Sequence, residues 1–146
     1  MIRKQAGFTL IESLFVLSVF LLIASITAFL LKPQYTILER QHFISQLQAD
    51  LLFAQAYALS HHLEVIVHIL PEQNRYIIHE KQSERFLIER EIPDLITIRE
   101  ESMMLYFYFL ADGNINRFGS FAIYAGKERY KFTFLIGKGR FYVAKE

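Results

Sequence analysis

The chain opens with a long apolar run. From Ser13 to Leu31 there are 19 residues without a charge, close to the ~20 that a helix needs to cross the hydrocarbon core of a bilayer. Arg3 and Lys4 precede the run, and basic residues beside a span tend to stay cytoplasmic. The pattern predicts one membrane-spanning helix with the rest of the chain exported. A cleavable secretory signal is the alternative, but its apolar core is shorter, about 7 to 15 residues.

A helical pattern with one apolar face follows Pro33. Apolar residues recur at spacings of 7, 3, 4, 3 and 4, which is typical of a helix with one buried stripe: Ile37, Ile44, Leu47, Leu51, Ala54 and Ala58. Proline removes a backbone hydrogen bond, so we expect a bend or local unwinding at Pro33. Polar side chains are expected on the water-exposed remainder of this helix: Glu39, Arg40, Gln41, Gln46, Gln48, Asp50 and Gln55.

After His61 and His62 the pattern changes to short runs rich in β-branched and aromatic residues, separated by turn signals. The expected strands are 64–70, 76–80, 86–92, 96–100, 105–110, 121–124, 130–136 and 141–144. Short connections predict an antiparallel meander, and Asp112-Gly113 is a hairpin-turn signal. The predicted fold class is therefore α+β: a long N-terminal helix, half transmembrane and half amphipathic, packed on an antiparallel β-sheet domain. The predicted parts are a short leader (1–7), a membrane-spanning helix (8–31), an amphipathic helix (32–62) and an antiparallel β domain (63–146).

Glu12 is the only charged residue between Phe8 and Leu31. A charged side chain within a bilayer costs roughly 2.5 to 3.5 kcal/mol on insertion scales and usually faces a partner. No residue of the run offers an opposite charge. We therefore expect a partner from another subunit, and a free amino group on Phe8, created by cutting after Gly7, is one such group. The alternative is a polar residue tolerated near the membrane surface, since Glu12 is only about 7 Å along the helix from Phe8.

These N-terminal residues resemble a known family. A short basic leader ending in Gly7, followed by Phe8-Thr9-Leu10-Ile11-Glu12, is similar to the leader and cleavage site of type IV prepilins. In that family a membrane peptidase cuts after the glycine and methylates the new N-terminal phenylalanine, and the glutamate helps to align subunits in a helical filament. The resemblance implies those roles for Gly7, Phe8 and Glu12.

Two further resemblances concern the subfamily. The stretch from Leu105 to Gly139 resembles the C-terminal domain of H-type minor pseudopilins. The arrangement of the whole chain, with Pro33 after the anchor, resembles the GD-type minor pseudopilin of Gram-positive competence operons. Together they imply a single-pass membrane protein with an extracytoplasmic domain, which joins a cell-surface pseudopilus that assists DNA uptake. A type II secretion pseudopilin and a DNA-binding pilus tip subunit are the alternatives.

The same resemblance implies the partners: other major and minor pseudopilins, the prepilin peptidase, membrane lipid and, indirectly, an assembly membrane protein and its ATPase.

No enzyme signature is visible. The chain has no cysteine, no glycine-rich phosphate loop and no His-Glu-x-x-His motif. His61 and His62 are adjacent and so point in different directions. We expect no enzyme activity, no cofactor and no metal. Glu89 and Glu91 are expected on a solvated strand face, and Tyr106 to Phe109 as alternating sheet core and surface.

Charge is unevenly distributed. The net charge of +1 becomes −1 once Arg3 and Lys4 leave with the leader, because 14 basic and 15 acidic residues remain. This balance argues against a general nucleic-acid binder. Residues 117–146 hold seven basic and two acidic side chains, which predicts a basic patch for docking unlike subunits or contacting DNA phosphates; the alternative is ordinary solubilising charge. The patch residues are Arg117, Lys127, Arg129, Lys131, Lys138 and Arg140.

Overall fold

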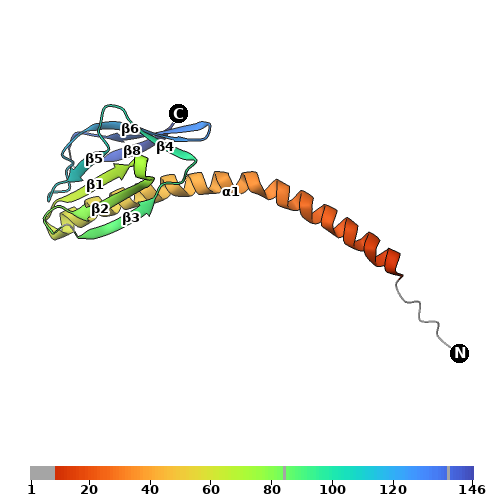
Figure 1. The fold of residues 1–146 in the computed structure, drawn as a ribbon. Coiled ribbons are helices and arrows are strands. Elements are labelled where there is room, and N and C mark those ends of the chain that lie inside the picture. Colours follow the sequence, from red (N-terminus) through yellow and green to blue (C-terminus); the bar gives the residue numbers. More distant parts are fainter. Residues whose placement is uncertain (1–8, 84, 138) are drawn as a thin grey trace. The chain divides into compact units, whose positions relative to one another are not determined.

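The structure is a computed structural model that describes residues 9–83, 85–137 and 139–146, without the side chains of residues 30–37. The chain forms two compact units, Met1–Glu39 and Arg40–Glu146. Within the described residues there are one long helix, a 3-10 turn and eight strands (Figure 1). They are α1 (Leu10–His61), β1 (Val65–Leu70), η1 (Pro71–Gln73), β2 (Arg75–Glu80), β3 (Phe86–Glu91), β4 (Ile96–Glu100), β5 (Tyr106–Phe109), β6 (Gly119–Ala125), β7 (Glu128–Phe134) and β8 (Phe141–Lys145).

Helix α1 ends without the glycine that usually terminates a helix. His62 takes the left-handed conformation, with φ of 52°, and the N–H of Leu63 donates to the carbonyl of Ala58 at 3.2 Å. This is the hydrogen bond of a Schellman cap. The prediction for Pro33 was a bend or local unwinding. The helical assignment runs through Pro33, so the chain is not unwound there, and proline costs the helix one hydrogen bond. Pro33 lies within residues 30–37, whose side chains the structure does not describe, so the predicted bend stays a prediction.

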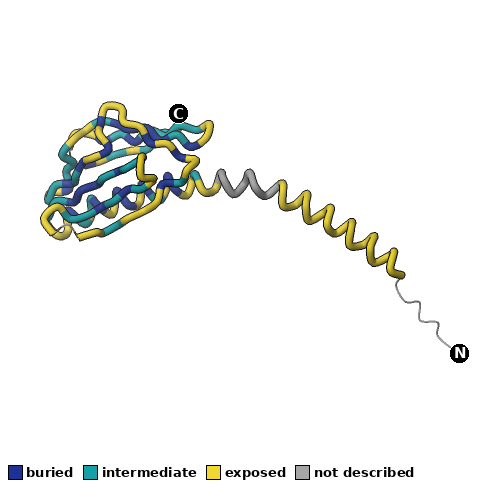
Figure 2. Tube along the Cα trace, viewed as in Figure 1, coloured by how far each residue is buried: buried dark blue, intermediate teal, exposed yellow. Residues whose placement is uncertain are grey.

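The predicted buried stripe of α1 is confirmed for its described members. Leu47, Leu51, Ala54 and Ala58 are fully buried, and Figure 2 shows the alternation of buried and exposed residues along this segment. The prediction for Asp50 is wrong, because this residue is only 5% exposed. Its carboxylate is buried with hydrogen-bond partners that come from the sheet, which a helical periodicity cannot show.

The strands form two antiparallel sheets instead of a single meander. In the described residues the orders are β3-β2-β1-β5 and β4-β6-β7-β8, so the chain crosses between the sheets before β4, β5 and β6. The physical reason is coverage: one helix can cover only part of a single eight-stranded sheet, whereas two smaller sheets bury their apolar faces against each other and the helix. All eight predicted strands are present, and the α+β prediction is confirmed.

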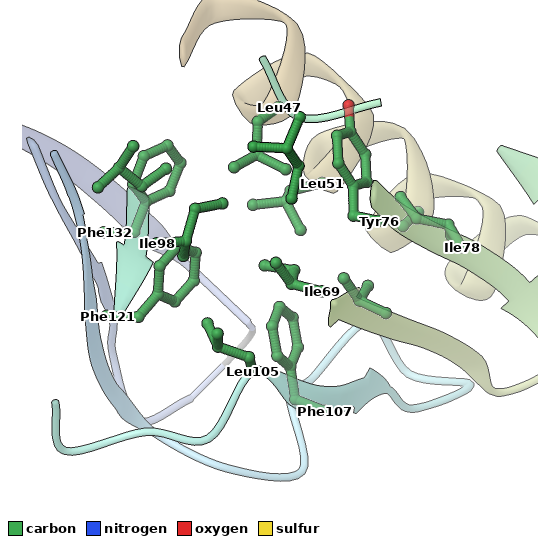
Figure 3. Close-up of a cluster of buried hydrophobic side chains, with 14 of the residues drawn as sticks. Leu47, Leu51, Ile69, Tyr76, Ile78, Ile98, Leu105, Phe107, Phe121 and Phe132 are labelled. Carbon is green, nitrogen blue, oxygen red and sulfur yellow. The ribbon is translucent and has the colours of Figure 1, made fainter. Parts of the chain in front are cut away.

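One hydrophobic core joins the three layers (Figure 3). Phe107 and Phe109 of β5 are fully buried, while Tyr106 and Tyr108 alternate to the other face of the strand, as predicted. The ring of Phe107 lies 5.2 Å from that of Phe134 on β7, a contact between the two sheets. Rings that meet at this distance add to the burial of their apolar area, which stabilises by about 25 cal/mol per Å².

The Asp112-Gly113 turn is present but does not join neighbouring strands. Gly113 has φ of 76°, its N–H donates to the Leu110 carbonyl at 2.8 Å, and the N–H of Asn114 donates to Asp112 Oδ1 at 2.9 Å. The turn closes one isolated bridge, between Phe109 and Ile115. The predicted turn is thus a short hairpin, extended by a hydrogen bond from the N–H of Asn116 to the Tyr108 carbonyl at 3.0 Å, but the chain then passes to the other sheet, so β5 and β6 are not paired.

Candidate functional site

The start of α1 holds Glu12 in a capping box. The N–H and Oγ1 of Thr9 donate to Glu12 Oε2 at 3.3 and 3.4 Å, and the N–H of Glu12 donates to Thr9 Oγ1 at 3.4 Å. These bonds are long and weak, but they give the carboxylate local partners beside the positive end of the helix dipole. The Thr-x-x-Glu signature was visible in the sequence and was missed. Glu12 therefore has hydrogen-bond partners in its own chain, and among residues 9–83, 85–137 and 139–146 none of them carries an opposite charge.

Glu12 opens a helical segment of membrane-spanning length. Residues Leu10–Phe29 have a mean hydropathy of 2.3 over 20 residues, and none of them is buried in the described part of the chain. The hydroxyls of Ser18, Ser25 and Thr27 donate back to carbonyls of the preceding turn at 2.7 to 2.9 Å, so they need no outside partner. Such a surface requires lipid or neighbouring helices. Gly7 and Phe8 lie outside the described residues.

The structure separates the predicted basic residues. Lys127 lies in the turn between β6 and β7, whereas Arg140 follows the turn between β7 and β8, at the other end of the same sheet. Arg117 precedes β6, near the end where Arg140 lies. Arg129 and Lys131 alternate with the core residues of β7 and so share its outer face. Lys138 lies outside the described residues.

Ion pairs neutralise much of this charge. Arg129 bonds to both Glu101 and Glu146, and Lys131 Nζ lies 3.5 Å from Glu101 Oε2. The guanidinium of Arg129 lowers the pKa of Glu101 below its ordinary value. Lys145 Nζ similarly lies 2.6 Å from Glu128 Oε1. The predicted patch is thus a mixed-charge surface at its centre, with its cations divided between the two ends of the sheet.

Asp50 is a buried carboxylate at the centre of a polar cluster that sequence reasoning missed. Its carboxylate accepts hydrogen bonds from Tyr76 Oη at 2.7 Å, Arg90 Nε at 3.0 Å and Gln46 Nε2 at 2.8 Å. Tyr76 is fully buried, and burial together with the bond to Asp50 raises the pKa of its hydroxyl. The cluster joins α1 to β2 and β3. Its chemistry is structural, because every polar atom named here is already engaged within the domain.

The histidines and acidic pairs offer no converging ligands. Among the described residues, no group of three or more His, Asp or Glu side chains is placed to hold a metal ion. The ring of His61 stacks on Tyr57 at 3.9 Å, and His68 meets the ring edge of Tyr106 at 5.1 Å. Burial lowers the pKa of His68. Glu89 is exposed and pairs with Arg75 at 2.9 Å, which confirms the solvated strand face.

Comparison with known proteins agrees with this description at both ends of the chain. A family described as the prokaryotic N-terminal methylation motif matches residues 2–28. No curated protein matches the sequence. Among solved structures, the minor pseudopilin EpsH from the type 2 secretion system of Vibrio cholerae is similar, with a TM-score of 0.53 and 11% identity over 73% of this chain and 94% of that chain. The chain therefore joins a segment similar to the prokaryotic N-terminal methylation motif to a domain with a fold similar to that of a minor pseudopilin.

Proposed function

We propose that this protein is a minor pseudopilin, a non-enzymatic subunit of a short pilus-like filament that helps to carry macromolecules across the cell envelope. One observation carries the proposal. The methylation motif, residues 2–28, overlaps an apolar helical segment of membrane-spanning length, Leu10–Phe29. The same helix, α1, continues to His61 in the packed domain, whose fold is similar to that of a minor pseudopilin. Such a helix can hold the subunit in the membrane before assembly, because its first part is apolar, and can carry the folded domain into a filament, because its second part belongs to the domain core.

The assembly step follows from the chemistry of the helix start. Cutting after Gly7 leaves a positively charged amine on Phe8, four residues from Glu12. An amine from a neighbouring subunit supplies the opposite charge that Glu12 has nowhere among the described residues of its own chain, and this attraction is strong where water is excluded. Contacts between Leu10–Phe29 and the helices of neighbouring subunits then replace contacts with lipid. The domain, residues 40–146, stays in water on the outer side of the membrane.

Two versions of the proposal differ in the macromolecule that the filament helps to transport, which is DNA in one and exported protein in the other. The arrangement of the chain resembles a competence pseudopilin, so we favour DNA uptake. The fold similarity to EpsH, a subunit of a secretion system, supports export of proteins as the second candidate. Deletion of the gene in its own organism separates them: loss of transformation with intact protein secretion supports the first, and the reverse result supports the second.

Direct DNA binding by the domain is the third version, and the charge arrangement favours it least. Arg129 and Lys131 are engaged with Glu101, which leaves few free cations on one face. Retention of the full chain, in detergent, on a DNA column at graded salt tests this. Retention that weakens steeply as salt rises would show phosphate contacts and would favour a DNA-gripping subunit. Elution in the void at low salt supports a purely structural role.

The assembly role is tested by two substitutions at the helix start. Glu12→Ala removes the charge, and we expect normal membrane insertion with impaired incorporation into filaments, measured by shearing and quantifying the subunit. Thr9→Val removes the capping hydroxyl and keeps the carboxylate. If Glu12 acts across subunits, Thr9→Val assembles nearly normally. Equal defects in both variants would assign Glu12 to helix capping alone, and normal assembly of Glu12→Ala would refute the mechanism.

Processing is tested separately. A bulky residue in place of Gly7 should block the peptidase and leave an uncut precursor, heavier by the mass of the leader, residues 1–7. The variant should remain in the membrane, because the apolar run is unchanged. A processed Gly7 variant would contradict the role of this glycine.

A further inference from the structure

The outward face of α1 in the domain carries no formal charge. Between Gln41 and Ser60 the only acidic or basic residue besides His42 is Asp50, which is buried. A helix surface in contact with water normally carries charged side chains, and the described sheet faces of this domain do so, with several ion pairs. We call this surface the uncharged helix face; its exposed residues are Gln41, His42, Ser45, Gln48, Ala49, Leu52, Phe53, Ala56, Leu59 and Ser60.

The middle of this face has the spacing of a helix-pairing seam. Ser45, Ala49, Leu52, Ala56 and Leu59 follow one another at intervals of 4, 3, 4 and 3 residues, which repeats the a and d positions of a heptad. Leu52 is 49% exposed and Leu59 52% exposed. Small residues between the leucines allow a second helix to approach closely. By helical periodicity the seam lies on the side of α1 opposite Leu47, Leu51, Ala54 and Ala58, which pack on the core. At its end Leu59 lies beside Gly113, so positions 45 to 56 are the open part of the seam.

We propose that this face pairs with the same face of a second copy of the chain, as a parallel helix pair above the membrane. The inference rests on the membrane anchoring proposed above. Two identical chains that enter a bilayer through the same residues run in the same direction and hold each residue at the same height. In such a two-fold pair each position meets its own copy. A charged position would then repel itself, and this face has none.

The pairing geometry can be read by disulfide formation, because the chain has no cysteine. A disulfide needs Cα atoms about 4.4 to 6.8 Å apart, which only positions at the centre of a close helix pair satisfy. The full chain carrying Leu52→Cys or Ala56→Cys is oxidised in native membranes and analysed by intact mass. Thr97→Cys is the matched control, since Thr97 is exposed on β4 and away from α1. We expect covalent homodimers at positions 52 and 56 and only monomer at 97.

A second variant separates pairing from chance collision. Ala56→Glu, added to Leu52→Cys, places like charges opposite each other and should abolish the cross-link. Thr97→Glu in the same background should not. Protease resistance of the β domain checks that the Ala56→Glu chain is folded, as expected for an exposed position.

The outcomes are decisive in either direction. Homodimers at 52 and 56 that Ala56→Glu abolishes support the inference. It is overturned by monomer at both positions, by equal dimer at position 97, or by a cross-link to a different protein. Extraction of the same membranes with alkaline carbonate distinguishes this failure from failure of the proposed function. A chain that stays in the membrane but does not dimerise overturns the pairing alone, whereas a chain that is extracted removes the anchor on which both proposals depend.

Discussion

The carboxylate of Asp50 accepts a hydrogen bond from the hydroxyl of Tyr76 at 2.7 Å, across the interface between α1 and β2, with both residues buried. Figure 3 shows the Tyr76 side chain extending from its strand towards the helix. Polar groups away from water are costly unless bonded, so this contact fixes one position of the helix along the sheet. A shifted helix would leave Asp50 unpaired.

Removing this bond should weaken the domain. Tyr76→Phe leaves Asp50 with Arg90 and Gln46, and we expect the free energy of unfolding to fall by about 1 to 2 kcal/mol. The measurement is urea unfolding of the full chain in detergent, followed by tyrosine fluorescence. Tyr106→Phe is the control, since Tyr106 is 45% exposed and its hydroxyl forms no hydrogen bond with a described residue across this interface. Equal effects of the two substitutions would contradict the role of the buried bond.

The turn between β7 and β8 contains two glycines with different constraints. At Gly139 a Cβ would lie 2.3 Å from the carbonyl oxygen of Gly113, whereas at Gly137 a Cβ would meet nothing within 4 Å. Both have positive φ, 57° and 90°, which costs an alanine roughly 1 kcal/mol. Gly139→Ala must also displace backbone, so it should lower the thermal unfolding temperature well below that of Gly137→Ala. A larger loss at Gly137 would mean that the close approach of residues 139 and 113 is wrong.

The ion pair between Glu101 and Arg129 predicts a pH dependence. Because Arg129 lowers the pKa of Glu101 in the folded state, the stability from this pair is present above the unfolded pKa and is lost as pH falls through the folded pKa. Glu101→Gln should therefore lower stability at pH 7 by about 0.5 kcal/mol, as usual for a partly exposed pair. The difference from wild type should shrink as pH falls below the ordinary glutamate pKa of 4.5 and through the lower folded pKa of Glu101. A difference that stays constant with pH would exclude this carboxylate as its source.

Local patterns in the sequence were sufficient for the elements and for the buried stripe of α1. Leu47, Leu51, Ala54 and Ala58 repeat with helical spacing, and alternation in Tyr106 to Phe109 identifies the inward residues. Strand pairing was beyond this reasoning. β5 pairs with β1 and not with β4 or β6, because partners are chosen by how two sheets share one core, which is a property of the whole domain.

The polar residues of the candidate site were predicted less well for the same reason. Asp50 looked like a surface residue of a helix because its partners, Tyr76 and Arg90, lie 26 and 40 residues away. The basic patch was predicted from the charges of residues 117–146 alone. The structure adds Glu101, which directly follows β4 and forms ion pairs with Arg129 and Lys131. The capping box of Thr9 and Glu12 is a different case, since its signature is local and was present in the sequence.

The central claim is that the chain is cut, modified and assembled through its N-terminus. The most direct test is the intact mass and N-terminal chemistry of the protein isolated from its own membrane. We predict a chain that lacks residues 1–7 and begins with N-methylated Phe8. A chain that retains Met1, or that begins elsewhere with an unmodified amine, would contradict the account.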